Sequence, residues 1–232
     1  MLIDVVKLKK FITEQKFNGM GNGMVKLIIV PNNTSLKGYI DAGLGLLGAS
    51  KDANVITSRG EDIPLIVEEF FSKGIEVIGM TGKDLLKEYQ LLNENTKLCV
   101  VKTILWVDKS AMFGKPVLCL LGPKGKTMEK LPKDLRICIN SKYKNLANKF
   151  LNQLELKDYN FERVYLSGST EVAYSTGLTD LVIDIVYTGA SMKSAGLEVY
   201  DKIYESDFVI ISVKEEEIPG SPRNLVNFPN RY

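Results

Sequence analysis

The sequence contains no histidine among its 232 residues. Mechanisms that need a Ser-His or Cys-His pair, or a metal held by imidazole, are therefore excluded within it. Its 3 cysteines, Cys99, Cys119 and Cys138, stand singly in apolar runs, which favours buried thiols in a reducing compartment over disulfides or a zinc site. The chemistry that remains uses carboxylates, Lys, Arg, Tyr, hydroxyls and backbone amides, with any metal brought in by the substrate.

The sequence also lacks a long apolar run and an excess of charge. Stretches such as LVIDIVY fall far short of the ~20 residues that a membrane-spanning helix needs. The first residues, MLIDVVKLKKFITEQKF, have neither the apolar core nor the cleavage site of a signal peptide. The 30 basic residues nearly balance 28 acidic ones, and the net charge is +2. We therefore expect a cytoplasmic protein with no nucleic-acid or membrane partner, in which any anion is bound locally.

The order of the apolar segments predicts an α/β fold. Runs at 25–30, 54–57 and 75–80 have the composition of buried strands, and segments with helical periodicity separate them. In one of these helices Pro64 suits the first turn, Asp62 its N-cap and Gly74 its end. This alternation is typical of a parallel βαβ sheet.

A second group of strands follows, and it predicts a second lobe. Runs at 115–122, 135–139, 163–168, 178–189, 197–203 and 207–213 are predicted strands, and 141–156 is a predicted helix. We expect two α/β lobes with a cleft between them. The first lobe would comprise residues 24–110 and 205–232, and the second residues 111–204, with a crossover at 93–114. Residues 1–23 would be an N-terminal extension, Met24 being a possible start, and the tail from 214 a surface or partner-contacting segment.

The stretch DIVYTGASMKSAGLEV, residues 184–199, is the first candidate for a binding site. A buried strand ends there at a turn that opens a short helix. Backbone N–H groups at such a turn lack intrahelical partners, and the helix dipole favours an anion beside them. The turn also has two hydroxyl donors. The candidate phosphate-binding residues are Thr188, Gly189, Ala190, Ser191 and Met192.

Two carboxylates lie upstream of this turn. Asp180 and Asp184 fall on one face of the strand, because residues four apart point the same way. Asp184, just below the turn, could accept hydrogen bonds from sugar hydroxyls. The alternative is that the turn is only a helix N-cap and that Asp180 is a plain strand-entry residue.

The surrounding residues, 166–199, contain the pattern G-x-x-E-x-A, then G-L-x-D-x-x-x-D, then T-G-x-S and G-L. The matching residues are Gly168, Glu171, Ala173, Gly177, Leu178, Asp180, Asp184, Thr188, Gly189, Ser191, Gly196 and Leu197. In length and order this pattern resembles the phosphoribosyl-diphosphate-binding region of the ATP phosphoribosyltransferases, which catalyse the first step of histidine biosynthesis. Ser191 stands where that family usually has Thr.

Two further blocks resemble the same family in the same order. The first contains Arg59, Asp62, Pro64, Val67 and Glu68, and the second contains Gly74, Gly79, Gly82 and Asp84. The resemblance covers roughly residues 25 to 213. It implies two α/β lobes similar to type II periplasmic binding proteins.

The resemblance also implies a reaction. In that family, N1 of ATP attacks C1 of phosphoribosyl diphosphate, pyrophosphate leaves, and Mg²⁺ accompanies the diphosphate. Carried over, the 188–192 loop would bind the 5-phosphate, and Asp184 would contact the ribose hydroxyls, with Asp180 and Glu171 as further substrate-binding residues. Asp184 and Arg59 would be catalytic, and no side chain is assigned to the metal.

The nucleotide would lie at the first lobe. The resemblance assigns ATP binding to Arg59, Asp62 and Gly82, with the Arg59 guanidinium suited to phosphates. The alternative for Arg59 is a surface ion pair with Glu61 or Asp62, of little energetic consequence.

The first lobe departs from the family pattern. Asn32, Asn33 and Thr34 stand where the family has Lys, Gly and Arg, and Ile66 and Val77 replace its usual Tyr and Asp. Lost cations would weaken stabilisation of a leaving diphosphate, which leaves open a second reading. In it the chain is a divergent, non-catalytic two-lobe protein that binds a phosphorylated sugar or nucleotide.

The segment 88–112 is longer than the family's crossover. The chain ends where the family's short form ends, and short-form chains work with a subunit resembling histidyl-tRNA synthetase. A homo-oligomer and such a regulatory partner are accordingly expected.

Overall fold

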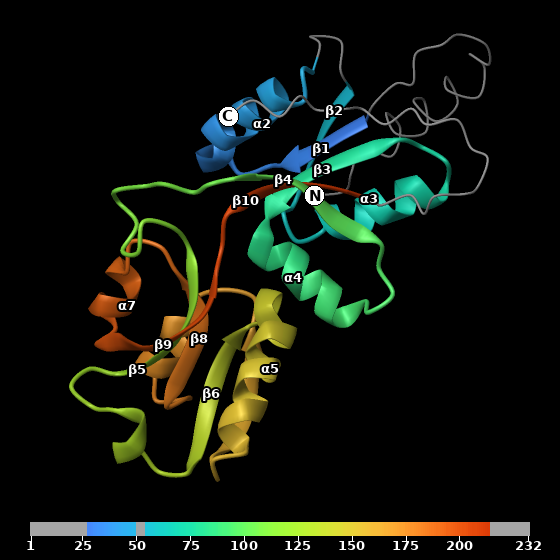
Figure 1. Cartoon of the computed structure of the whole chain (residues 1–232). Helices are drawn as coiled ribbons and strands as arrows, with labels where there is room; N and C mark the ends of the chain where they lie inside the picture. The colour runs from blue at the N-terminus through green and yellow to red at the C-terminus, as the bar shows by residue number, and fades with distance from the viewer. Residues whose placement is uncertain (1–26, 50–53, 214–232) are drawn as a thin grey trace, which may run out of the picture.

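Residues 27–49 and 54–213 are described by a computed structural model, and their strands form two five-stranded sheets (Figure 1). Each sheet has its own helices, so the described chain has two α/β lobes. The predicted N-terminal extension, residues 1–23, and the predicted tail from 214 lie outside the described residues.

The first sheet has the strand order β2-β1-β3-β10-β4. β1 is parallel to β2 and β3, and β10 is antiparallel to β3 and β4. Buried side chains of β1, α3, β3 and β10 make its core, among them Ile29, Ile63, Met80 and Phe208. Its elements are β1 (Leu27–Pro31), η1 (Thr34–Leu36), α2 (Lys37–Leu46), β2 (Asn54–Ser58), α3 (Ile63–Ser72), β3 (Val77–Gly82), α4 (Lys83–Leu92), β4 (Leu98–Ile104) and β10 (Phe208–Val213).

The second sheet has the strand order β7-β6-β8-β5-β9. β6 is parallel to β7 and β8, whereas β5 is antiparallel to β8 and β9. The strands of its centre are apolar over nearly their whole length because both faces are covered. Its elements are β5 (Val117–Pro123), η2 (Met128–Lys130), β6 (Asp134–Asn140), η3 (Ser141–Tyr143), α5 (Lys144–Glu155), β7 (Asn160–Leu166), α6 (Thr170–Ser175), β8 (Leu181–Val186), α7 (Ala190–Ser194) and β9 (Leu197–Glu205).

The predicted α/β fold with two lobes is confirmed, and so is the parallel βαβ arrangement at its start. In α3, Pro64 lies in the first turn and Gly74 follows the helix end with φ of +75°. Asp62 does occupy the N-cap position, but its side chain makes no capping hydrogen bond. The backbone of Asp62 is already helical, with φ −87° and ψ −18°, so the side-chain cap predicted from sequence is not formed.

The chain crosses between the two sheets at residues 105–116 and again at Ser206 and Asp207, and these crossings are bonded to each other. Lys115 Nζ lies 2.8 Å from Asp207 Oδ1, which also accepts the Trp106 N–H at 2.9 Å. The Ser206 N–H donates to the Pro116 carbonyl at 3.0 Å. An ion pair and hydrogen bonds thus join the two connecting segments, and these contacts limit the movement of one lobe relative to the other.

The lobes also touch through α4 and α5, where the first turn of α5 reaches the flank of α4 (Figure 1). The Glu88 carboxylate of α4 accepts the N–H groups of Asn145 and Leu146, at 2.6 and 2.8 Å, in the first turn of α5. Nearby, Lys142 Nζ lies 3.3 Å from Glu61 Oε1. Residues that follow β2 and β3 thus contact residues that follow β6, so the carboxyl edges of the two sheets face each other.

The three cysteines are free thiols. Burial raises the pKa of Cys119 to about 12 and that of Cys138 to about 11, whereas Cys99 is half-buried. Cys119 and Cys138 therefore remain protonated, as buried thiols should. Across residues 27–49 and 54–213, every helix is too short or too polar to cross a lipid bilayer.

Candidate functional site

Asp184 is held in place at the carboxyl end of β8 by three hydrogen bonds. Asn140 Nδ2 donates to its Oδ1 at 2.9 Å, the Thr170 hydroxyl to its Oδ2 at 2.5 Å, and the Ile185 N–H to its Oδ1 at 2.7 Å. Asn140 ends the neighbouring strand β6, and Thr170 begins α6. Two elements besides its own strand thus fix the orientation of this carboxylate.

Burial raises the pKa of Asp184, while hydrogen bonds from Thr170, Ile185 and Asn140 act in the opposite direction. The negative charge of Glu171, in the first turn of α6, raises it further. Within the described part of the chain no cation pairs with Asp184. A half-buried carboxylate without a cation retains acceptor capacity for hydroxyl groups of a ligand.

Thr170→Val should weaken binding of phosphoribosyl diphosphate about 5- to 10-fold at neutral pH, the effect of losing one hydrogen bond to a charged group. The pKa of Asp184 should rise, because the variant removes a donor that lowers it. Calorimetry across pH should therefore show that, on acidification, the affinity of the variant begins to fall at a higher pH than that of the wild type. Thr176→Val, at the other end of α6, is the matched control, and identical profiles for all three proteins would contradict the role of Thr170.

The 188–192 loop presents a set of unpaired donors. Gly189 is buried with φ of +74°, and the Ala190 N–H donates to Thr188 Oγ1 at 3.3 Å. The N–H groups of Ser191 and Met192 have no acceptor among the described residues, and the hydroxyls of Thr188 and Ser191 are in exposed positions. Since α7 is only five residues long, its dipole contributes little, and the donors themselves supply the attraction for an anion.

Residues 105–116, which connect the lobes, pack against this loop. The Met112 N–H donates to the Tyr187 carbonyl at 2.7 Å, and the Tyr187 hydroxyl hydrogen-bonds Asp108. A Cβ atom at Gly189 would lie 3.1 Å from Met112 Sδ. The φ of +74° favours glycine at position 189, and a side chain there would also press against Met112. Sequence reasoning gave the 93–114 crossover no part in the site, because nothing local indicates where it packs.

Asp180 lies at the opposite end of β8 from the 188–192 loop. Its Oδ2 accepts the Arg136 N–H at 2.8 Å and lies 3.9 Å from Arg136 Nε. The strand separates it from Asp184 by about 13 Å. The two carboxylates share a face of the strand as expected, but the structure does not bring Asp180 to the loop, and this favours the strand-entry reading.

Arg59 follows β2 at the carboxyl edge of the first sheet, and its side chain is exposed. Over the described ranges it forms no ion pair, and Glu61 pairs with Lys142 of the other lobe instead. The expected alternative, an ion pair of Arg59 with Glu61 or Asp62, is therefore not formed. Asp62 is exposed in the same turn, and Gly82 stands at the N-cap of α4 on the same edge.

The turn after β1 is neutral. Asn33 Oδ1 accepts the Ser35 N–H at 3.0 Å and so caps η1, and the Asn32 N–H donates to the Ser58 carbonyl at 2.8 Å. Thr34 is exposed. These polar residues stabilise the turn itself and add no positive charge to the edge where Arg59 lies.

The side chains near the loop do not form a metal site. Among residues 27–49 and 54–213, no three Asp, Glu, Cys or His side chains gather as metal ligands would. Asp184 and Glu171 are two carboxylates near this loop, and Asp108 is bonded to the hydroxyl of Tyr187. A divalent cation at this edge would need most of its ligands from a bound substrate.

A known protein family matches the part of the chain that contains this loop. The family model described as ATP phosphoribosyltransferase matches residues 59–225. The ATP phosphoribosyltransferase of Caldicellulosiruptor saccharolyticus is 33% identical over 172 residues, which cover 72% of this chain and 71% of that protein. That of Lachnospira eligens is 34% identical over 146 residues, covering 63% and 59%. That of Sulfurisphaera tokodaii is 34% identical over 170 residues, covering 70% and 52%. The aligned part is thus between about half and about seven tenths of these relatives.

Solved structures give a consistent result. The ATP phosphoribosyl transferase (HisG:HisZ) complex from Thermotoga maritima matches with a TM-score of 0.60 and 26% identity, over 82% of this chain and 88% of that one. The periplasmic aliphatic sulphonate binding protein SsuA of Escherichia coli matches with a TM-score of 0.53 and 14% identity, over 81% and 65%. At 14% identity SsuA shows the fold alone, and it confirms the predicted likeness to periplasmic binding proteins.

Proposed function

The chain belongs to the ATP phosphoribosyltransferase family, and we propose that it transfers the phosphoribosyl group of phosphoribosyl diphosphate to N1 of ATP in histidine biosynthesis. In this step the bond from N1 to C1 forms, the bond from C1 to the diphosphate oxygen breaks, and its electron pair leaves with pyrophosphate. The observation that carries the proposal is the donor-rich 188–192 loop beside the half-buried Asp184, inside the part of the chain that the family model matches. The comparisons do not favour the second reading, a non-catalytic binding protein.

In the second lobe, the 188–192 loop would bind the 5-phosphate. The N–H groups of Ser191 and Met192 and the hydroxyls of Thr188 and Ser191 supply the donors. Asp184 would accept hydrogen bonds from the ribose hydroxyls, and its negative charge would stabilise positive charge that develops on the ribose as the diphosphate leaves. Glu171 would add to this negative field, and we assign Asp180 only the anchoring of Arg136.

In the first lobe, Arg59 would bind the phosphates of the nucleotide. Its side chain lacks an ion-pair partner within the described residues, and it lies at the edge that faces the second lobe. Asp62 and Gly82 belong to the same edge and would line the nucleotide position. Holding N1 of ATP against C1 of the ribose is the main contribution that such an arrangement makes to the rate.

Magnesium would enter on the diphosphate. When bound there, it supplies neutralisation of the charge on the leaving pyrophosphate. The side chains fit this role for a substrate-borne metal, since Asp184 and Glu171 are too few to complete a protein site. The chain's own contribution is to place the sugar and to hold the carboxylate beside it.

A second protein subunit is part of the proposal. The T. maritima match is to a complex named HisG:HisZ, and this supports a regulatory partner, which we propose resembles histidyl-tRNA synthetase. A homo-oligomer and a cytoplasmic location complete the proposal. We also propose that residues 111–204 form the unit that binds the phosphoribosyl group, with residues 24–110 and 205–232 forming the first lobe.

The activity test mixes the chain with ATP, phosphoribosyl diphosphate and Mg²⁺, with and without the candidate partner, and follows the release of pyrophosphate. We expect release that depends on both substrates and on the metal. A folded protein that releases no pyrophosphate under either condition would contradict the proposed function.

Restoring positive charge after β1 should accelerate the reaction. Asn32→Lys combined with Thr34→Arg is expected to raise kcat/KM by about 3- to 10-fold, because a cation near the leaving diphosphate stabilises it. The matched control adds the same charges at exposed positions away from this edge, as Asn95→Lys with Ser72→Arg, which precede β4 and β3 at the amino edge of the sheet. Equal rates for both double variants and the wild type would show that the first lobe does not contact the diphosphate.

A further inference from the structure

Tyr187 joins β8 to the 188–192 loop, and both its backbone and its side chain contact the segment that connects the lobes. Its carbonyl accepts the Met112 N–H at 2.7 Å, and its hydroxyl donates to Asp108 Oδ2. Its ring lies edge-on to that of Trp106, with 6.1 Å between the ring centroids. The residue directly before the loop is thus bonded to and packed against residues 105–116.

Asp108 is oriented for this contact by its own turn. Its Oδ1 accepts the Ser110 N–H at 2.8 Å and the Ser110 hydroxyl at 2.7 Å, and its backbone N–H donates to the Gly114 carbonyl at 2.9 Å. The hydrogen bonds from Tyr187 and Ser110 lower the pKa of Asp108, so this carboxyl group is ionised at neutral pH. An ionised acceptor makes a stronger hydrogen bond than a neutral one. The turn therefore holds Oδ2 in place for the Tyr187 hydroxyl.

Trp106 extends these contacts to the first lobe. Its ring packs on that of Tyr39 in α2, with 4.7 Å between the ring centroids, and its N–H donates to Asp207 Oδ1 in the other connecting segment. Trp106 therefore lies between Tyr187 of the second lobe and Tyr39 of the first. Because closely packed side chains transmit strain, a shift of Tyr187 changes the surroundings of Trp106.

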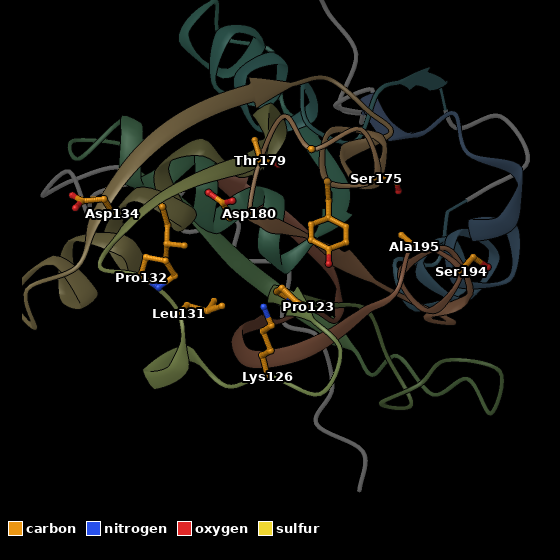
Figure 2. A pocket seen from close by; sticks show the side chains of 13 residues that line it. Pro123, Lys126, Leu131, Pro132, Asp134, Ser175, Thr179, Asp180, Ser194 and Ala195 are labelled. Carbon is orange, nitrogen blue, oxygen red and sulfur yellow. The ribbon is translucent and has the colours of Figure 1, made fainter.

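The far end of the short helix α7 has a different environment. Ser194 and Ala195 border an open hollow at the amino ends of β6 and β8 (Figure 2). Since open space adjoins this end of α7, the helix is positioned by the contacts of Tyr187 and Met112 before its start and by the buried Met192 side chain. These contacts therefore set the position of the N–H groups in the 188–192 loop.

We propose that Tyr187 is a positioning residue for the sugar-phosphate site. Its hydrogen bond to Asp108 holds the 188–192 loop in the geometry that binds the 5-phosphate, and it links the loop to the residues that connect the lobes. A sugar phosphate bound on the loop then alters the surroundings of Trp106 through Tyr187. This proposal rests on the proposed function, because it requires the loop to bind the 5-phosphate.

The first test is a double-mutant cycle in which calorimetry measures the binding of phosphoribosyl diphosphate with Mg²⁺ in the absence of ATP. Tyr187→Phe keeps the ring and removes the hydroxyl, and Asp108→Ala removes its acceptor. We expect each variant to bind about 3- to 10-fold more weakly, and the double variant to bind no more weakly than the weaker single variant, since both remove one hydrogen bond. Losses that multiply in the double variant, or wild-type affinity in both single variants, would overturn the proposal.

A kinetic and a spectroscopic measurement separate positioning from a general loss of stability. Tyr187→Phe should raise KM for phosphoribosyl diphosphate about 3- to 10-fold and leave KM for ATP unchanged. Trp106 is the chain's one tryptophan, so the fluorescence of tryptophan reports on its contact with Tyr187. The fluorescence change on saturation with phosphoribosyl diphosphate should be at least halved in Tyr187→Phe.

Tyr89→Phe is the matched control, because it removes a hydroxyl that donates to the Glu68 carboxylate in the first lobe. It should behave as the wild type does in each of these measurements. A wild-type protein that does not bind phosphoribosyl diphosphate would contradict both the proposed function and this proposal. A wild type that binds it, with the same KM and the same fluorescence change in Tyr187→Phe, would contradict this proposal alone.

Discussion

Asp184→Asn is expected to lower kcat/KM for phosphoribosyl diphosphate by about 100-fold or more while leaving the protein at least as stable as the wild type. The loss follows from removing the negative charge that Asp184 would hold beside the ribose in the proposed site. The fold should tolerate Asn, because its amide oxygen still accepts from Asn140 and the Thr170 hydroxyl can turn to accept from the new amide.

The effect on stability has a defined pH dependence. Burial raises the pKa of Asp184 in the folded protein above its value in the unfolded chain. Between these two pKa values the folded state binds more protons than the unfolded state does. The free energy of unfolding of the wild type therefore falls as the pH rises through this range, and it stays lower at higher pH. The neutral variant avoids this loss, and the difference between the two proteins should close at acid pH.

The measurements are the melting temperature of both proteins across pH and kcat/KM at neutral pH. Asp201→Asn, at an exposed position on β9, is the control and should change neither quantity. Retention of full activity by Asp184→Asn would mean that the substrate does not lie against this carboxylate.

Gly189→Val is expected to weaken binding of phosphoribosyl diphosphate by about 30-fold or more. A β-branched residue at φ of +74° is strained by about 1–2 kcal/mol, and its side chain would press against Met112. The backbone should move to relieve both, which displaces the N–H groups of Ser191 and Met192 from the phosphate. Ser191→Ala, which removes one donor only, should have a milder effect of about 3- to 10-fold.

Gly125→Val is the matched control for the strained backbone. Gly125 has φ of +79° with open space around its Cβ position, and it lies outside the loop. Calorimetry should show near wild-type affinity for Gly125→Val and a clear loss for Gly189→Val, with melting curves to confirm that both fold. Wild-type affinity in both Gly189→Val and Ser191→Ala would reduce the loop to a simple helix cap.

The arrangement of strands and helices could be predicted because buried strands and amphipathic helices leave different periods in the sequence. The turn at Gly189 and the short helix that follows it could likewise be predicted, since they depend on residues adjacent in the chain, whereas the binding of a phosphate there stays a prediction. The hydrogen-bond partners of Asp184, in contrast, could not be predicted from the sequence. Asn140 and Thr170 reach it from β6 and α6, and only the order of strands in the finished sheet brings these residues together.

Two other differences between the sequence-based predictions and the structure also arise from tertiary contacts. A period of two places Asp180 and Asp184 on one face, but it says nothing of which end of the strand a ligand would occupy. The local sequence favoured an ion pair for Arg59, whereas Glu61 finds Lys142 across the lobes. Separation along the chain does not reveal that Glu61 pairs with Lys142, or that Asp180 binds Arg136.

The most direct test of the account is a crystal structure of the chain with phosphoribosyl diphosphate and Mg²⁺. We predict the 5-phosphate on the N–H groups of Ser191 and Met192, the ribose hydroxyls within hydrogen-bond distance of Asp184, and the diphosphate directed towards the edge that carries Arg59. A 5-phosphate bound away from the 188–192 loop, with Asp184 contacting no sugar hydroxyl, would contradict it.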